Sequence, residues 1–339
     1  MPHRPLIVIA VALLASQASA QESPLPDLVD VRYSDSYDRC LLDIWLPPQD
    51  GPPAQTVIYF HGGAFVAGSK ENIKLEEEFK ALPALGIALV SCEYPFLPDV
   101  GASPPATDLE QLQPIFDACA EVVFFLHANS VQYNLDTSRF LTAGSSAGSV
   151  ISQVLNYNMD LGLTGTLTIQ YPNDAQEITA LYDAGDQPNA FYTISAPDTD
   201  GHHPDNARDA NEVCRNVGVP TILYGSEQSG LPLVPEGQQF VLLALDLINE
   251  NTPRGCSPAD ITTTGATIVG QAGYGEPDGL SDLDDLGYYL TDWIAGGAES
   301  DRTTAGATIP GQPDFGLPDG MVDIDDLGYF LSFWLVGCA

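Results

Sequence analysis

A short pattern of small residues near the middle of the chain constrains its fold more than any other feature. The apolar run Phe140–Ala143 ends at Gly144–Gly148, which reads Gly-Ser-Ser-Ala-Gly, and a helix-like segment follows. A serine framed by two glycines is typical of a strained turn from a strand into a helix, where the missing Cβ atoms let backbones approach closely. An ordinary Gly/Ser-rich loop is the alternative. The pattern predicts a strand, a sharp turn that exposes Ser146, and a helix.

Segments on both sides of this pattern alternate between strand-like and helix-like sequence. Continuous apolar runs predict buried strands, and apolar residues at helical spacing predict helices between them. Such alternation is typical of the α/β class, with a mostly parallel sheet covered on both faces. Eight strands are expected, the first two as a hairpin, at residues 28–33, 40–46, 56–60, 87–92, 140–143, 166–171, 191–195 and 219–224. Helices are expected near residues 70–85, 107–128, 206–217 and 236–250, and after Ser146.

The charge balance excludes some partners. The chain has 46 acidic and 11 basic residues and a net charge of −35. Long-range repulsion therefore argues against nucleic acid and anionic membrane surfaces as partners. A high density of carboxylates is typical of calcium-binding proteins, and it also keeps a protein soluble in saline surroundings.

Residues 1–20 are expected to be a signal peptide. A positive start precedes the apolar run Leu6–Ala15, and Ala18–Ala20 offers a small-residue cleavage site. Because no later segment is long and apolar enough to span a bilayer, the mature chain is expected to be secreted without a membrane span. Six cysteines in an exported chain then favour disulfides.

A second glycine-rich segment follows the expected strand at residues 56–60. It begins His61-Gly62-Gly63, and consecutive glycines after a strand let backbone N–H groups converge on a substrate oxygen. Removing one such donor in acyl transfer typically costs about 2.7–4 kcal/mol. A His-Gly-Gly segment alone is a weak signal, but a Gly-x-Ser-x-Gly segment some eighty residues later makes the pair a strong one.

With both motifs present, residues 28–250 resemble the α/β-hydrolase family. The nearest branch is similar to secreted esterases with a His-Gly-Gly motif, including carboxylesterases and feruloyl- or acetylxylan-esterase-like enzymes. The resemblance implies Ser146 as nucleophile and an oxyanion hole built from the N–H groups of Gly63, Ala64 and Ala147. No dinucleotide or Walker motif is present, so no cofactor is expected for catalysis.

The resemblance also implies an acid and a base, in the chain order Ser, Asp or Glu, His. The segment after the strand at 191–195 offers Asp200 as the acid, with Asp198 as the second choice. The base is expected after the strand at 219–224, but Ser229 stands there and no histidine follows His203.

Two hypotheses for the base therefore stay open. In the first, His203 or its neighbour His202 supplies the imidazole from the loop after the previous strand, at the same carboxyl edge of the sheet. We take His203 as the expected base. In the second, the base has been lost, and the domain binds without efficient turnover because a triad without its base loses several orders of magnitude in rate.

The C-terminal part of the chain contains an internal repeat with a period of 41 residues, in which the segment from Thr262 aligns with the segment from Thr303. If Asp278 is the fifth position of an EF-hand-type loop, Asp282 is the ninth and Asp285 the twelfth. The second repeat has equivalent carboxylates. The predicted calcium ligands are Asp278, Asp282, Asp285, Asp319, Asp323 and Asp326. Helices are expected at 286–293 and 327–334.

Two loop-helix repeats of this kind resemble a dockerin, in the variant that ends with Gly337-Cys338. The resemblance implies calcium-dependent docking to a cohesin-like partner or attachment at the cell surface. Tyr274 and Phe315 stand at the first loop position instead of the usual Asp. A disulfide between Cys256 and Cys338, which flank the module, is a further hypothesis.

The sequence therefore predicts three parts: a signal peptide (1–20), an α/β-hydrolase domain with an eight-stranded sheet (21–252), and a dockerin-like, EF-hand-like helical module (253–339). The expected function is hydrolysis of carboxylic esters by a secreted serine esterase, with small-molecule or polysaccharide-linked acyl esters as substrates. The alternative is a catalytically degenerate hydrolase that serves as a binding or surface protein.

Overall fold

The structure is a computed structural model. It describes most of the chain from residue 24 to residue 334. The described residues are 24–49, 51, 53–105, 109–159, 161–172, 181–183, 185–199, 201–251, 261–262, 265–266, 268, 271, 274–275, 283–297, 300–306 and 320–334. The expected signal peptide lies outside them.

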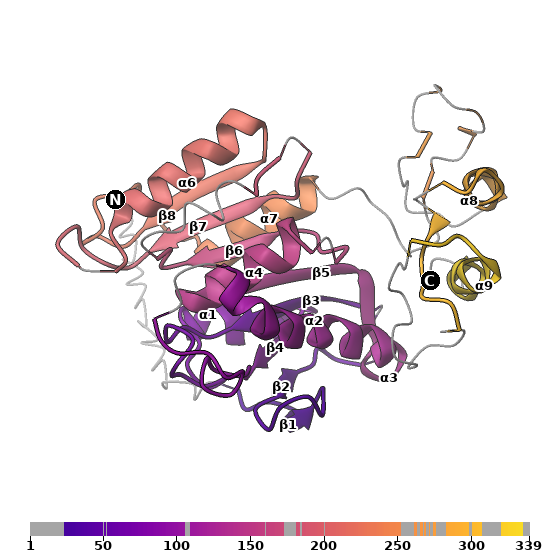
Figure 1. Ribbon diagram of the computed structural model, residues 1–339. Helices are drawn as coiled ribbons and strands as arrows, with labels where there is room; N and C mark the ends of the chain where they lie inside the picture. The colour runs from indigo at the N-terminus through magenta and orange to yellow at the C-terminus, as the bar shows by residue number, and fades with distance from the viewer. Residues whose placement is uncertain are drawn as a thin grey trace, which may run out of the picture.

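One eight-stranded sheet organises the first 250 residues (Figure 1). Its strand order is β1-β2-β4-β3-β5-β6-β7-β8. β1 pairs with β2 and β2 with β4 in antiparallel fashion, and all other pairs are parallel. The strands are β1 (Leu28–Arg32), β2 (Leu41–Trp45), β3 (Ala54–Phe60), β4 (Ala88–Cys92), β5 (Leu135–Ser145), β6 (Thr166–Ile169), β7 (Asn189–Thr193) and β8 (Thr221–Gly225). The predicted α/β class and the eight strands are confirmed.

Helices cover both faces of the sheet. One face carries α2 (Gln113–Ala128), α4 (Ala147–Tyr157) and α6 (Pro204–Val217), and the other carries α1 (Glu76–Lys80) and α7 (Phe240–Asn251). The short helix α3 (Ser130–Tyr133) follows α2.

Two expected helices are shorter than the sequence indicated. The segment 70–85 forms only α1 and a 3₁₀ turn, Leu82–Leu85, which has Pro83 as its second residue and is followed by Gly86 in the left-handed conformation. The segment 107–128 becomes helical with a 3₁₀ turn, Glu110–Leu112, and α2 starts with Pro114 in its first turn. Proline lacks an N–H donor and is favoured at a helix start, so it begins a new helix more easily than it continues one.

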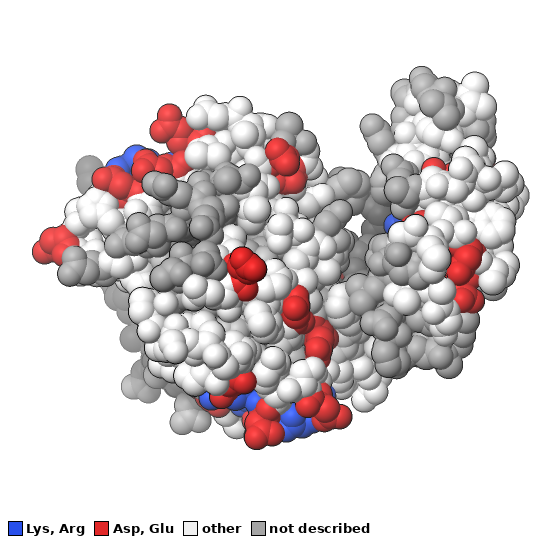
Figure 2. All heavy atoms as spheres, viewed as in Figure 1, with Lys and Arg blue, Asp and Glu red and all other residues white. Residues whose placement is uncertain are grey.

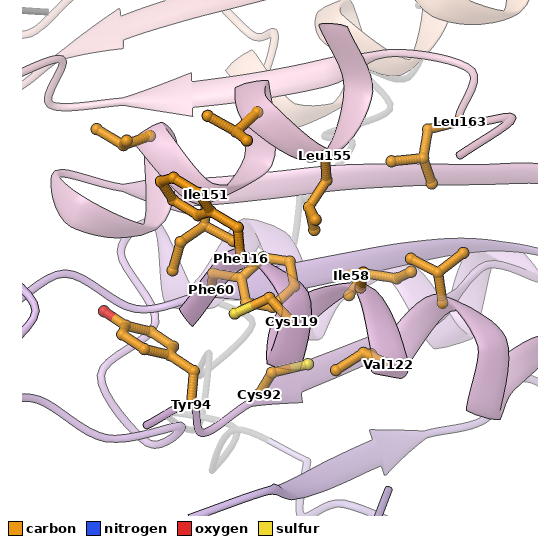
Figure 3. Packing of buried hydrophobic residues seen from close by; sticks show 14 of the residues in the cluster. Ile58, Phe60, Cys92, Tyr94, Phe116, Cys119, Val122, Ile151, Leu155 and Leu163 are labelled. Atoms are coloured by element: carbon orange, nitrogen blue, oxygen red, sulfur yellow. The ribbon is translucent and has the colours of Figure 1, made fainter. Parts of the chain in front are cut away.

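The core explains why the central strands are apolar on both sides. Alternate residues of β3 enter different clusters: Ile58 and Phe60 pack towards α2 and α4, whereas Val57 and Tyr59 pack towards α1 and α7. Figure 3 shows Phe116 of α2 beside Phe60 of β3 and Ile151 of α4. A strand buried on both faces has no polar face, which is why these strands read as continuous apolar runs.

The expected disulfides are wrong for the four cysteines that the structure describes. These residues are free, buried thiols: Cys40, Cys92, Cys119 and Cys214. Cys92 and Cys119 belong to the same apolar cluster (Figure 3). Buried cysteines of this kind act as small apolar side chains. The hypothesised pair, Cys256 and Cys338, lies outside the described residues.

Two further helices follow, α8 (Leu283–Ala295) and α9 (Ile324–Trp334). The rings of Tyr289 and Phe330 stack with their centroids 4.0 Å apart and their planes 8° from parallel. The Trp293 indole N–H donates to the Asp323 carbonyl over 2.7 Å. The two helices therefore share a small apolar core of their own. Within the described part of the chain, no helix has the length and apolar character needed to cross a membrane.

The surface reflects the composition. On the face shown in Figure 2, acidic side chains are more abundant than basic ones and are spread over several elements. This distribution agrees with the net charge of −35.

Candidate active site

The turn at Ser146 has the geometry that its sequence predicts. Ser146 lies between β5 and α4 with φ 56° and ψ −117°, a sparsely populated conformation for a residue with a side chain. A Cβ atom added at Gly144 would lie 2.1 Å from the Gly148 carbonyl oxygen, and one added at Gly148 would lie 2.0 Å from the Phe60 carbonyl oxygen. Both glycines are therefore required by close backbone approach. The Ser146 N–H donates to the Ile169 carbonyl over 2.9 Å and fixes the turn against β6.

A histidine contacts this serine directly. Nε2 of His202 lies 2.8 Å from Ser146 Oγ. Burial, and then the positive charge of Lys74, lower the pKa of His202 below its ordinary value of 6.5. The imidazole is therefore neutral at pH 7, and in the tautomer with Nε2 unprotonated it accepts the hydrogen bond of the Ser146 hydroxyl.

The neighbouring histidine, His203, does not contact Ser146. It is the N-cap of α6, and its Nδ1 accepts a hydrogen bond from the Asp205 N–H over 3.1 Å. Pro204 is in the first turn of α6, so the helix begins directly after His203 and holds that side chain at its own end. Of the two histidines considered from the sequence, the structure thus brings the alternative, His202, to Ser146 and not the preferred His203.

The two predicted acids are not seen to join this pair. Asp200 lies outside the described residues. Asp198 is exposed, and no carboxylate in the described ranges forms a hydrogen bond with His202. The described part of the site is therefore a Ser146–His202 dyad.

The glycine-rich segment after β3 lies beside Ser146. We call residues 61–70 the β3 loop. A Cβ atom added at Gly62 would lie 2.8 Å from the Ser145 carbonyl oxygen and 3.2 Å from Ser146 Cβ. Gly63, Ala64 and Phe65 all have positive φ, at 136°, 53° and 60°. Left-handed residues in succession form a tight turn in which N–H groups are free to point at a ligand.

The predicted oxyanion donors are free in this arrangement. No acceptor among the described residues pairs with the N–H groups of Gly63, Ala64 or Ala147. Ala147 is the first residue of α4, where N–H groups have no partner within the helix. The arrangement can therefore offer hydrogen bonds to an anionic oxygen bound beside Ser146 Oγ.

Buried charges hold the β3 loop from the side of β4. Glu93 follows β4; its Oε1 accepts the Lys70 N–H over 3.0 Å, and its Oε2 forms an ion pair with Arg39. Arg39 in turn donates to the Gly68 carbonyl over 3.2 Å, and the His61 ring has Nε2 3.7 Å from Glu93 Oε2. Burial alone would raise the pKa of Glu93, but the His61 ring, the Lys70 N–H and the Arg39 charge together lower it.

A second charged group fixes the far end of the same loop. The Lys70 ammonium is buried and lies 3.0 Å from Asp43, 2.9 Å from Asp30 and 3.2 Å from Glu71. Burial alone would lower the pKa of Lys70, but hydrogen bonds to these carboxylates raise it. The lysine is therefore charged and compensated. His61 is fully buried and stacks on Tyr94 with ring centroids 4.3 Å apart, so it supports the loop from within.

The segment after β8 has no histidine and has a different set of contacts. Ser226 donates its N–H to the Thr193 carbonyl over 2.9 Å and its hydroxyl to the Ile194 carbonyl over 2.7 Å. Ser229 donates its hydroxyl to the Ser226 carbonyl over 2.8 Å. This segment therefore supports the described residues after β7, 194–199 and 201–203, which we call the β7 loop and which include His202.

Among the six predicted calcium ligands, Asp278, Asp282 and Asp319 lie outside the described residues. Oδ1 of Asp285 accepts the N–H groups of Ile261 and Thr262, each over 2.8 Å. Oδ1 of Asp326 accepts those of Arg302 and Thr303 over 2.6 and 2.8 Å, and its Oδ2 accepts the N–H of Asp323 over 2.8 Å.

Backbone donors thus engage Oδ1 of Asp285 and both carboxylate oxygens of Asp326. Both side chains are fully buried. In the described residues, no group of three or more His, Cys, Asp or Glu side chains could hold a metal ion. Calcium binding by the repeats stays a prediction.

The fold that carries this site is similar to the folds of solved structures. The chain is similar to a bifunctional GH43-CE protein of Bacteroides eggerthii, with a TM-score of 0.51 and 17% identity over 66% of this chain and 38% of that one. It is also similar to a truncated carbohydrate esterase from gut microbiota, with a TM-score of 0.50 and 17% identity over 66% of this chain and 95% of that one. At this identity the likeness shows the fold: the chain has an α/β-hydrolase-like fold that esterases also have.

A family model described as BD-FAE matches residues 42–186. The match is to less than half of the chain. It begins in β2 and includes the β3 loop and the Ser146 turn, but it ends before β7 and His202. A search of curated proteins gave no match. The similarity therefore covers Ser146 and the β3 loop, and leaves out the segment that contains His202.

Sequence reasoning missed several residues that support the site. Glu93 and Gln170 are polar residues placed directly after apolar strands, a position that puts them at the carboxyl edge of the sheet beside Ser146. Their place directly after an apolar strand is the sequence signal that could have identified these two residues. Their partners, such as Arg39, are distant in sequence, and nothing in the local pattern pairs them.

Proposed function

We propose that this protein is a secreted serine ester hydrolase that acts on carboxylic esters. Ser146 is the nucleophile and His202 the general base in this proposal. One observation carries it: Nε2 of His202 lies 2.8 Å from Ser146 Oγ, within the distance needed for proton transfer. The fold, shared with a carbohydrate esterase, supports polysaccharide-linked acyl esters as a substrate class.

The arrangement suits acyl transfer in two stages. His202 accepts the proton of Ser146 Oγ as this oxygen attacks the acyl carbon, and the N–H groups of Gly63, Ala64 and Ala147 stabilise the negative charge on the former carbonyl oxygen. Collapse of the tetrahedral intermediate breaks the bond to the alcohol oxygen, which takes the proton from His202. A water molecule, deprotonated by His202, then cleaves the acyl-serine ester and releases the acid.

Hydrolysis of a short-chain nitrophenyl ester tests this proposal. The wild-type protein and its His203→Ala variant should both hydrolyse the ester, whereas Ser146→Ala and His202→Ala should be near the uncatalysed rate. Wild-type protein without activity, or Ser146→Ala with full activity, would overturn the proposal. The first of these results would favour the alternative function, a degenerate hydrolase that binds esters without turning them over.

We further propose that the C-terminal repeats tether the enzyme to a cohesin-like or cell-surface partner. Support comes from the equivalent contacts of the two repeats, in which Asp285 and Asp326 accept backbone N–H groups at positions 41 residues apart. Calorimetric titration of the full chain with calcium tests the metal prediction. Absence of heat and of any change in thermal unfolding would contradict calcium binding, and would leave docking to be tested with the metal-free protein.

A further inference from the structure

Gln170 occupies an unusual backbone position beside the proposed active site. It follows β6 directly and has φ 56°, in the left-handed region that glycine and asparagine favour. A non-glycine residue keeps such a conformation only where its surroundings fix it, and such residues gather at functional sites. The contacts of Gln170 show what fixes it.

The side chain of Gln170 holds the start of the β7 loop by three hydrogen bonds. Its Oε1 accepts the N–H groups of Ile194 and Ser195 over 2.6 and 3.1 Å. Its Nε2 donates to Ser195 Oγ over 2.7 Å. One amide group therefore satisfies two consecutive backbone donors and one hydroxyl, where the chain leaves β7 and runs on towards His202.

The backbone at the same point holds the nucleophile. The Ile169 carbonyl, one residue before Gln170, accepts the Ser146 N–H over 2.9 Å, and the Gln170 N–H donates to the Tyr192 carbonyl over 2.8 Å. In the sheet, β6 lies between β5, which leads to Ser146, and β7, which leads to His202 (Figure 1). The end of β6 therefore contacts both the serine turn and the segment that carries the histidine.

Ser226 completes the support from the other side. Its hydroxyl donates to the Ile194 carbonyl over 2.7 Å, while the Ile194 N–H donates to Gln170. The N–H and the carbonyl of Ile194 are thus both hydrogen-bonded by side chains, one that follows β6 and one that follows β8. The resemblance to the α/β-hydrolases led us to expect the histidine in the segment after the last strand, and in the structure this segment supports the β7 loop, which contains His202.

We propose that Gln170 and Ser226 are positioning residues that hold the β7 loop so that His202 meets Ser146. The inference rests on the proposed function, because it concerns the activation of Ser146 by His202. Displacement of a catalytic group by about 1 Å can cost on the order of 100-fold in rate. The reaction rate of Ser146 is therefore the property that these residues control.

The test is the rate at which a fluorophosphonate labels Ser146 in the full chain, because this reaction depends on the activated serine. Gln170→Leu should label about 10–100-fold more slowly than wild type, and Ser226→Ala about 3–10-fold more slowly. In ester hydrolysis the same variants should lose kcat while KM changes by less than about threefold, since substrate contacts are unchanged.

Gln55→Leu is the matched control. Gln55 is a buried glutamine at the start of β3, and its amide hydrogen-bonds with Asn249 and Arg139. Both leucine variants should unfold at lower temperature, but Gln55→Leu should label at the wild-type rate. Equal labelling of Gln170→Leu and wild type would overturn the positioning role, as would equal slowing of both leucine variants.

The two possible failures are distinguishable. If wild-type Ser146 is not labelled at all, the proposed function fails. If wild type is labelled and His202→Ala is not, but Gln170→Leu reacts at the wild-type rate, only the positioning role fails. Gln170→Gly separates backbone strain from hydrogen bonding: slow labelling supports the role of the amide, and wild-type labelling contradicts it.

Discussion

Two loops meet at Ser146, and they are held by different kinds of interaction. The β3 loop is fixed by charged groups, since Glu93 and Arg39 pair beside it and the Lys70 ammonium is buried at its end. The β7 loop is fixed by neutral groups, the amide of Gln170 and the hydroxyl of Ser226. The loop proposed to stabilise an anion is thus held by ion pairs, and the loop that supplies a titrating histidine is held by groups that do not titrate.

This difference has a physical reason. Burial and the charge of Lys74 already lower the pKa of His202, and a charged group in the support of the β7 loop would shift this pKa further. An amide and a hydroxyl position the loop without adding charge. The N–H groups of the β3 loop do not titrate, so charged residues can hold that loop without changing the protonation of its donors.

The β7 loop should be the more sensitive to loss of its functional side chain. His202→Ala should lower kcat for a nitrophenyl ester by about 1,000-fold or more, because Ser146 loses the group that accepts its proton. His203→Ala should keep kcat within about threefold and lose about 1 kcal/mol of stability through the missing α6 cap. Steady-state kinetics and urea unfolding measure the two effects. A larger kinetic loss in His203→Ala would reverse the assignment.

In the β3 loop, the most sensitive position should be Gly62. A Cβ atom there would lie 2.8 Å from the Ser145 carbonyl oxygen, so Gly62→Ala must shift the backbone beside the proposed oxyanion donors. We expect kcat to fall by about 100- to 1,000-fold, the cost of one lost donor. Gly51→Ala is the control, because its Cβ would lie 3.6 Å from the Pro48 carbonyl oxygen, an ordinary contact. Full activity in Gly62→Ala would show that this loop does not bind the oxyanion.

The contribution of Glu93 to the free energy of unfolding should depend on pH. Glu93→Gln should lose about 1–3 kcal/mol of unfolding free energy at pH 7, because a buried carboxylate with several partners is removed. The pKa of Glu93 is lowered in the folded state, so its contribution is complete above its unfolded pKa and is lost as pH falls through the folded value. The difference between wild type and Glu93→Gln should therefore shrink in acid.

Urea unfolding from pH 7 down to pH 3 measures this dependence. For Gln170→Leu the difference from wild type should stay constant over the same range, because no titrating group is removed. Glu121→Gln is the surface control; Glu121 accepts a hydrogen bond from Ser36, and its loss should cost less than about 1 kcal/mol. A constant difference for Glu93→Gln would contradict the charged support of the β3 loop.

The smallest expected effect concerns Lys74. Burial and the charge of Lys74 lower the pKa of His202 below 6.5, so the acid limb of the kcat/KM profile should have its midpoint below pH 6.5. Lys74→Gln removes the charge and should move this midpoint to higher pH. Lys80→Gln, which breaks a surface pair with Glu76, should leave it unchanged. A midpoint that does not respond to Lys74→Gln would show that burial alone sets this pKa.

The fold was predictable because its signals are local. Buried parallel strands such as β3 and β4 read as continuous apolar runs, and the glycines around Ser146 mark the turn directly. The choice between His202 and His203 depended on where α6 begins. Pro204 was a usable signal for that boundary, since proline favours the first turn of a helix and makes His203 its cap.

Long-range support was not predictable in the same way. Arg39 and Glu93 meet across 54 residues, and Gln170 reaches Ser195 across 25. Such pairs depend on strand order and not on neighbouring residues. The disulfide prediction was wrong for the four described cysteines because export and cysteine count say nothing about distance or burial, and these thiols pack in the apolar core.

The most direct test of the Ser146–His202 site is an experimental structure of the full chain after reaction with a short alkyl fluorophosphonate. We predict phosphorus bonded to Ser146 Oγ, the phosphoryl oxygen about 2.7–3.1 Å from the N–H groups of Gly63, Ala64 and Ala147, and His202 Nε2 beside the serine oxygen. A phosphoryl oxygen directed away from the β3 loop, or His203 in the place of His202, would show that Ser146 and His202 do not form the proposed active site.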